Sequence, residues 1–177
     1  MTVLQLLHDY NRGDRNFSEL SLRQITLANT SLSGADFSRC DLSGADLSHT
    51  DLSRANLAEA NLTDSELVGC DLSGVNAPGV NFIGTDAKGA SFVGANLMGA
   101  DLRAANLEGA DLRGADLTDA LLSGANLNAA NLSGACLDMS QIESVDCEGA
   151  VLDDLVAAAN CSVASESLHW ISWGAHS

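Results

Sequence analysis

An unbroken five-residue repeat is the feature of this sequence that most restricts its fold. From residue 15 to residue 154, every residue whose number ends in 2 or 7 is apolar, and most of them are Leu. Five residues of an α-helix turn through about 500°, so these side chains would not share one helix face, and an odd spacing sends them to alternate faces of a strand. The chain must therefore turn at every repeat to bring them into one interior. This pattern predicts a solenoid of stacked coils.

The residues around the apolar position favour the same arrangement. The residue two positions earlier is usually small, and the residue just before is mostly Asp or Asn, whose side chains bond nearby backbone groups and favour turns. The last residue of the unit is often Gly, which tolerates tight corners. We name the apolar position the central column and the Asp/Asn position the pre-central column. The predicted core of the central column is Phe37, Leu42, Leu47, Leu52, Leu57, Leu62, Leu67, Leu72, Phe82, Phe92, Leu97, Leu102, Leu107 and Leu112.

The repeating unit, Ala-Asp/Asn-Leu-Ser-Gly with variants, resembles the pentapeptide-repeat family. Ala45-Asp46-Leu47-Ser48 and Ala125-Asn126-Leu127 are clear examples. The resemblance implies an all-β fold, a right-handed quadrilateral β-helix with four pentapeptides in each coil and about seven coils in the whole repeat. The beginning of the chain looks like the beginning of many cyanobacterial members of the family, through Leu6, Leu7, Tyr10, Gly13, Arg15 and Phe17.

Three segments follow from the extent of the repeat. Residues 1–14 carry apolar residues at helical spacing, and we expect a capping helix there over the first coil. Residues 15–154 form the β-helix, and residues 155–177 form a C-terminal cap or tail. The tail either folds back over the last coil or makes a homodimer or partner contact at that end. The residues expected in such an interface are Leu168, Trp170, Ile171 and Trp173.

Charge and composition exclude several classes of function. The net charge is −16, and residues 114–177 contain no Lys or Arg. Such a balance argues against direct nucleic-acid binding, which needs a basic surface, and against binding to anionic membranes. The sequence has neither a secretory signal pattern nor an apolar run long enough to span a membrane, so we expect a cytoplasmic protein.

The sequence predicts no catalytic residue, no cofactor and no metal site. The four His have no metal-ligand spacing, and the phosphate-loop, nucleophile-elbow and zinc-protease motifs are missing from the sequence. The Asp residues recur in one column and alternate with Asn, as a backbone-bonding role allows, whereas a catalytic carboxylate would be unique. We therefore expect a protein that is not an enzyme.

Two functions remain, apart from a mainly structural role. The first is a protein–protein interaction or regulatory scaffold with an unidentified protein partner. The second rests on the resemblance, because some family members are proposed to mimic duplex DNA when they bind DNA gyrase. Duplex DNA carries on the order of 20 charges over about 34 Å, which is comparable with this chain. Coils of four pentapeptides would stack acids on two faces, Asp46, Glu66 and Asp86 on one and Asp51, Asp71 and Asp111 on the other.

Overall fold

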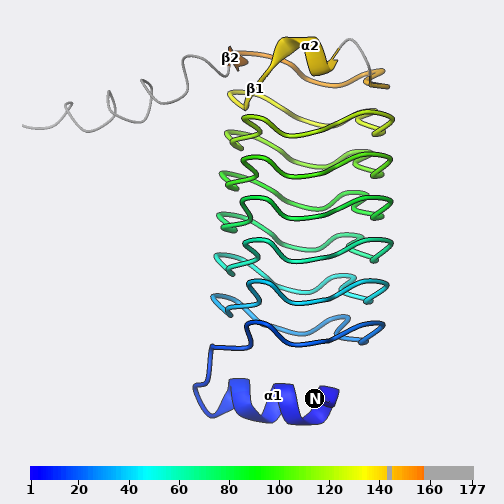
Figure 1. Cartoon of the computed structure of the whole chain (residues 1–177). Coiled ribbons are helices and arrows are strands. Elements are labelled where there is room, and N and C mark those ends of the chain that lie inside the picture. Colours follow the sequence, from blue (N-terminus) through cyan, green and yellow to red (C-terminus); the bar gives the residue numbers. More distant parts are fainter. Residues whose placement is uncertain (143–144, 158–177) are drawn as a thin grey trace, which may run out of the picture.

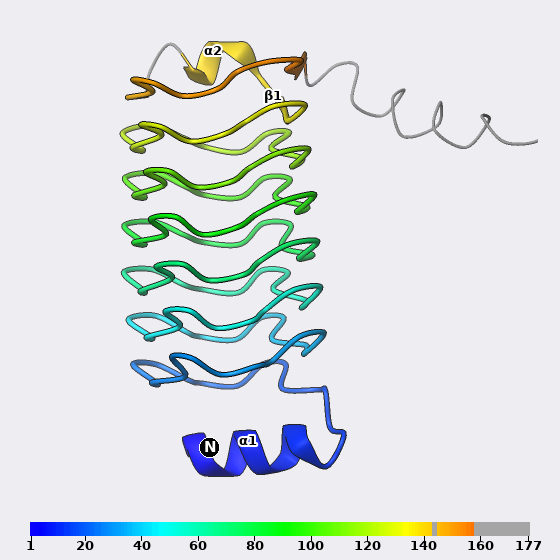
Figure 2. The same ribbon diagram turned by 180° about the vertical axis from the view of Figure 1, so that it is seen from behind.

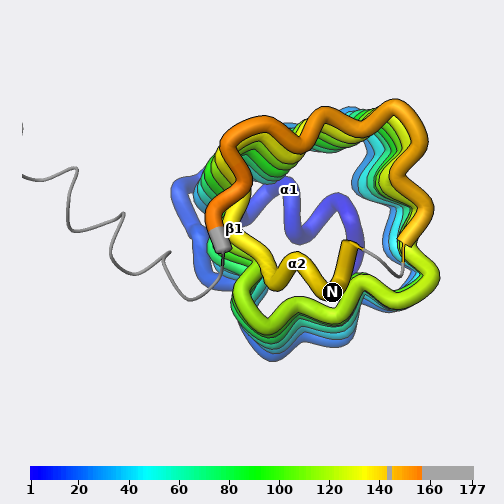
Figure 3. The backbone as a smooth tube through the Cα atoms, turned by 90° about the horizontal axis from the view of Figure 1, so that it is seen from above, coloured from blue at the N-terminus to red at the C-terminus, as the bar shows by residue number. Residues whose placement is uncertain are grey.

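The structure is a computed structural model that describes residues 1–142 and 145–157. Along the chain it contains α1 (Val3–Asn11), β1 (Cys136–Leu137), α2 (Met139–Ile142) and β2 (Val156–Ala157). Between α1 and β1, the chain winds into coils stacked in one column, with α1 beneath the first coil and α2 at the opposite end (Figure 1; Figure 2 shows the back). Viewed along the column, successive coils superpose as four-sided rings (Figure 3).

Each coil takes twenty residues, which is four pentapeptides. Residues of the pre-central column form parallel bridges to the residue twenty positions later, beginning with Asn16 and Asp36. Around Leu107, the backbone N–H donates to the carbonyl oxygen of Asn126 at 2.8 Å, and the N–H of Asn126 donates to the carbonyl of Ala105 at 3.0 Å. These bonds join each coil to the next and satisfy backbone groups that would otherwise be buried without partners.

A turn follows the central residue in each regular pentapeptide before β1. The N–H of Ala110 donates to the carbonyl of Leu107 at 3.0 Å, and Gly109 between them has φ 65°. A positive φ at the third residue is typical of a type II turn and favours Gly there. Ala104 adopts φ 56° at the equivalent position one pentapeptide earlier, so a residue with a side chain is tolerated. Gly69 has a second reason to be Gly, because an added Cβ would lie 2.6 Å from Nδ1 of His49.

The β structure consists of single bridges rather than extended strands, apart from β1 and β2. The family resemblance predicts an all-β fold in the form of a β-helix, and the described coils contain little extended strand. The reason is that most of every pentapeptide lies in or beside a turn, which leaves one residue in register with its neighbour. β1 and β2 are parallel, with Cys136 paired to Val156 and Leu137 paired to Ala157.

The interior is filled by the central column. Every residue that the sequence analysis named for this column is at most 1% exposed. The small residues two positions earlier, mostly Ala, are buried beside them and let the four walls of the coil approach closely.

One coil is packed differently from the others. Its central residues are Ala77, Phe82, Ala87 and Phe92, whereas the next coil has four Leu. The rings of Phe82 and Phe92 meet edge to face with centroids 6.0 Å apart. Val75 and Val80 are buried in the same coil, at positions where the next coil has Ala. Large and small side chains therefore alternate in this layer, and the total volume is approximately kept.

Helix α1 lies beneath the first coil (Figure 1). Leu6 is completely buried, and the hydroxyl of Tyr10 donates to the carbonyl oxygen of Ser33 at 2.9 Å. Oγ1 of Thr2 accepts from the N–H of Gln5 at 3.2 Å, as an N-cap does. The side chain of Gln5 bonds Asp9 rather than Thr2, so the reciprocal half of a capping box is not made.

The C-terminal end departs from the unbroken repeat. On the face of Leu122, the bridges of the described residues end at Leu121, and α2 follows in the next coil. The ladder resumes with the bridge between Asn126 and Asp146 and reaches β2, beyond residue 154. The repeat therefore keeps its phase across α2, while the first residues of segment 155–177 continue the β-helix.

Candidate functional site

The pre-central column has a local structural role. Oδ1 of Asp51 accepts from the N–H of Ser53 at 2.9 Å and from its hydroxyl at 2.6 Å. The bond from the Ser53 hydroxyl has the largest effect and, against the opposing effect of burial, holds the pKa of Asp51 below its usual value. Asn makes the same backbone contact, as Asn131 does with Ser133 at 3.0 Å. Either residue type therefore supports the turn.

On two faces of the β-helix, amide side chains separate the carboxylates of successive coils. Nδ2 of Asn56 donates to Asp36 at 3.0 Å, and Nδ2 of Asn61 donates to Asp41 at 3.2 Å. In the described parts of these two columns, no bridge joins one acidic residue to another. The carboxylates there are each followed by a neutral partner.

The other two faces are different. Asp46 bridges to Glu66, and Glu66 bridges to Asp86; in the neighbouring column, Asp51 bridges to Asp71. These three bridges are the acid–acid bridges among the described residues, and they lie on adjacent faces because consecutive pentapeptides occupy consecutive faces. We call these five residues the acidic corner.

The charges of the acidic corner are not neutralised by ion pairs. The described residues form five ion pairs, Arg23–Asp41, Arg39–Glu19, Lys88–Glu108, Arg103–Asp101 and Arg113–Asp111. None of them involves the acidic corner. Two unit charges at the strand spacing of about 4.8 Å repel each other by about 0.9 kcal/mol in water. The stacking therefore adds a repulsion that Asn would avoid, and this repulsion opposes the stabilisation from turn hydrogen bonds such as those of Asp51.

Asp111 does not belong to the acidic corner, although the sequence analysis placed it on the same face as Asp51 and Asp71. Ser91 stands between Asp71 and Asp111 in the column of bridges. A guanidinium nitrogen of Arg113 lies 2.7 Å from Asp111, and this bond, against the effect of burial, lowers the pKa of the carboxyl. Its charge is accordingly balanced locally.

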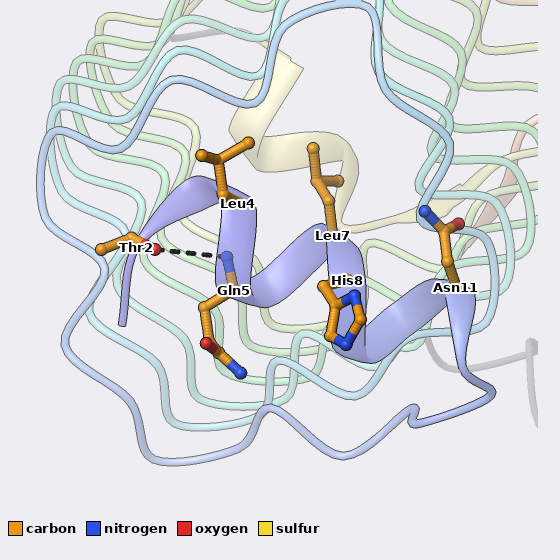
Figure 4. A pocket seen from close by; sticks show the side chains of 6 residues that line it. All are labelled: Thr2, Leu4, Gln5, Leu7, His8 and Asn11. Carbon is orange, nitrogen blue, oxygen red and sulfur yellow. Dashed lines mark hydrogen bonds between the residues drawn. The ribbon is translucent and has the colours of Figure 1, made fainter.

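Two hollows on the described surface are shallow and open to solvent. One, of about 550 Å³, runs along α1 and is lined by the side chains that Figure 4 shows: Thr2, Leu4, Gln5, Leu7, His8 and Asn11. The other, of about 370 Å³, is lined by Arg23, Gln24, Ser43, Gly44, Asn61, Thr63 and Asp64. Neither encloses a ligand in the way that small-molecule sites do. In the described part of the chain, no group of three or more His, Cys, Asp or Glu side chains could hold a metal ion.

Two further regions bear on interactions. The predicted interface residues Leu168, Trp170, Ile171 and Trp173 lie outside the described residues. Sequence reasoning missed an exposed apolar surface near α2, which includes Leu121. The signal was present in the sequence, because Leu121 occupies the pre-central column, where every earlier residue is polar.

No helix in residues 1–142 and 145–157 has the length and the apolar character needed to cross a bilayer. No curated protein sequence matches the chain.

Solved structures to which the chain is similar include two cyanobacterial pentapeptide repeat proteins and a fluoroquinolone resistance protein. HetL, involved in heterocyst differentiation regulation in the cyanobacterium Nostoc sp. strain PCC 7120, is 29% identical, with 88% of this chain and 94% of that chain covered and a TM-score of 0.49. Rfr23 from the cyanobacterium Cyanothece 51142 is 24% identical, with 86% and 100% covered and a TM-score of 0.36. QnrB1, a plasmid-mediated fluoroquinolone resistance protein, is 20% identical, with 86% and 99% covered and a TM-score of 0.35.

The family assignment rests on the sequence match rather than on these structural likenesses. The family described as "Pentapeptide repeats" matches residues 16–54, 40–76, 65–103 and 105–140, with eight copies of its repeat. These ranges cover most of the chain and include the bridged coils described above. The chain therefore belongs to the pentapeptide repeat family, whose fold is the right-handed β-helix.

Proposed function

We propose that this protein is a non-enzymatic interaction scaffold and that its acidic corner binds a basic surface of a protein partner. The observation that supports this most directly is the stacking of acid on acid at Asp46, Glu66 and Asp86 and at Asp51 and Asp71. Like charges directly opposite each other across a bridge are destabilising.

The turns do not require these carboxylates. Asn supports the same turn elsewhere, and Asn between two acids would remove the repulsion. Within the part of the chain that the structure describes, the Glu66 side chain makes no hydrogen bond or ion pair, so the turn gains nothing from its charge. Binding to a partner accounts for the acids in these positions, because Lys or Arg side chains of the partner would relieve the repulsion between them.

The shape of the surface favours a protein over a small molecule. The two described hollows are open, and neither is lined by residues of the acidic corner. A repeating, flat and charged surface is suited to extended contacts with another macromolecule. The net charge of −16 selects a basic partner.

The test compares two variants of equal net charge. The corner variant carries Asp46→Asn, Glu66→Gln and Asp86→Asn. The control variant carries Asp36→Asn, Asp101→Asn and Asp116→Asn, which are pre-central residues of the other two faces. We expect the wild-type protein and the control to retain a specific polypeptide from a cytosolic lysate at low salt, and the corner variant to lose it. Retention of the same polypeptide by the corner variant would contradict the proposal.

The stacked acids also favour a second function, DNA mimicry directed at DNA gyrase. In this case, a gyrase surface that binds the phosphates of DNA binds the regularly spaced carboxylates of the two adjacent faces in their place. On this alternative, the protein inhibits or protects gyrase in a supercoiling assay, the effect weakens as salt rises, and the corner variant loses it. Unchanged supercoiling at low salt would exclude this alternative and leave the scaffold proposal standing.

The finer architecture is also a proposal. We infer about seven coils, with α1 as an N-terminal cap that contributes the buried Leu6 and with a cap or a homodimer contact at the C-terminal end. The cytoplasm is the expected location of the interaction. Sedimentation of the purified chain over a range of concentrations tests the homodimer, because a mass that stays that of one chain would contradict it.

A further inference from the structure

Exposed apolar side chains occur among the acids at the C-terminal end of the β-helix. The pre-central column is polar from Asn16 to Asp116 and then contains Leu121 and Val151. Leu121 is 45% exposed, Val151 is 40% exposed, and Met139 of α2 is 49% exposed. We call these three residues the apolar collar; Leu121 and Val151 lie on opposite faces of the column, because their columns of bridges are two pentapeptides apart in the four-sided coil. They stand in contrast to the polar outer faces of the preceding coils.

The core is also less completely covered at this end. Ile142, Leu152 and Leu155 pack against the core but remain only half-buried. At the opposite end, Leu6 of α1 and Phe17 of the first coil are at most 3% exposed. Among the described residues, α2 is the element that lies across the C-terminal end of the column, and it has only four residues (Figures 1 and 3). Apolar surface at this end therefore needs a further covering segment.

We infer that residues 158–177 of the same chain dock on the apolar collar. β2 ends at Ala157, which pairs with Leu137 two residues before α2 begins, so residue 158 follows a point near Met139 of the collar. A chain of this length can extend over about 66 Å, so reach is not limiting. The segment is apolar enough to cover the collar, because it contains Val163, Leu168, Trp170, Ile171 and Trp173.

Charge favours this segment over a second copy of the protein. Residues 138–157 contain no Lys or Arg, and their acids are Asp138, Glu143, Asp146, Glu148, Asp153 and Asp154. Two copies that met through this end would bring both sets of acids together without a counter-charge, which opposes association at low salt. Residues 158–177 contain one acid, Glu166, and no Lys or Arg. They therefore bring little repulsion to the same surface.

The two Trp of the chain, Trp170 and Trp173, both lie in the proposed segment, so Trp fluorescence excited at a wavelength that Tyr10 does not absorb reports on it alone. The full chain is compared with a double variant, Leu121→Gln with Met139→Gln. Met98→Gln is the control, because Met98 is 44% exposed but lies outside the collar. A peptide of residues 158–177 supplies the reference for Trp that is fully accessible to water. Emission maxima and acrylamide quenching are measured at low salt, sedimentation gives the mass, and circular dichroism checks that each variant is folded.

We expect the wild-type chain to be a monomer whose Trp emission is blue-shifted and protected from acrylamide relative to the peptide. The double variant should lose the shift and the protection, while the control keeps both. Peptide-like quenching of the wild-type chain would overturn the inference. A shift that persists in the double variant would also overturn it, because the segment would then dock elsewhere. A shift that appears only with a dimer would identify a second copy as the occupant.

Discussion

Replacement of Glu66 by Gln tests whether the acidic corner stores electrostatic repulsion. Glu66 lies between Asp46 and Asp86 in one column of bridges, and its side chain is exposed. Gln has nearly the same shape, so the substitution removes one charge and little else. We expect Glu66→Gln to raise the free energy of unfolding, although most substitutions lower it.

The magnitude follows from the spacing of the coils. Each of the two neighbouring charges, at about 4.8 Å, contributes about 0.9 kcal/mol of repulsion in water without salt. Physiological salt, with a Debye length of about 8 Å, reduces this roughly by half, and exposed side chains can turn away from each other. A stabilisation of about 0.5–1 kcal/mol at low ionic strength is therefore expected, and it should become smaller as salt is added.

Glu108→Gln is the matched control. It makes the same chemical change on the same face, but Glu108 pairs with Nζ of Lys88 at 3.0 Å. Because both partners are substantially exposed, loss of this ion pair should lower the free energy of unfolding by no more than about 1 kcal/mol. Urea unfolding of both variants at low and high salt, with unchanged m values, measures the two effects.

Opposite signs for the two variants would show that the position of the charge decides the effect. If both variants were stabilised equally, the general excess of negative charge would be responsible, and the acid–acid bridges would carry no special meaning. If Glu66→Gln lowered stability at low salt, the repulsion argument would be wrong, and the scaffold proposal would lose its main physical support.

Three further predictions concern the fold. Leu6→Ala should lower the free energy of unfolding by about 2–5 kcal/mol, whereas Leu4→Ala, at a residue that is 82% exposed, should change it by less than about 0.5 kcal/mol; equal urea midpoints would refute the capping role of α1. Gly69→Ala should destabilise more than Gly89→Ala, because both have positive φ but only Gly69 is covered by an imidazole. A thermal melt compares the two. The hydroxyl of Ser53 lowers the folded-state pKa of Asp51. The ionised Asp51 therefore contributes its full stabilisation above its unfolded pKa of about 3.9, and this contribution is lost as the pH falls through the folded-state pKa. In urea titrations at decreasing pH, the free energy of unfolding of Asp51→Asn should therefore fall less steeply than that of the wild-type protein.

The five-residue period was sufficient to place the core. A side chain such as that of Leu107 could be assigned to the interior because neither a helix nor a strand buries residues five apart on one side. The number of pentapeptides in a coil came from the family resemblance instead. The period gives the direction of each side chain at its turn but not how many turns close a ring, and this number decides which residues stack.

The C-terminal departures were harder to predict. Ile142 keeps the period, so the central column gives no sign that α2 ends at this residue. The exposed Leu121 carried a signal, because it replaces a polar residue in a column that supports turns. The helix itself depends on tertiary context at the end of the column, where the next coil no longer fixes the backbone on that face.

Residues of the pre-central column interact at two sequence separations: with the turn two residues later, and with the pre-central residue twenty positions later. Within one turn, Asp and Asn are interchangeable, because both accept the backbone N–H two residues later. Between residues twenty apart they are not interchangeable. Asn one coil after Asp donates a hydrogen bond to it, whereas Glu one coil after Asp meets a like charge. The five-residue pattern therefore leaves the choice free, and the twenty-residue spacing gives that choice an energetic consequence. For this reason we assign binding to the faces where acids stack rather than to the acidic column as a whole.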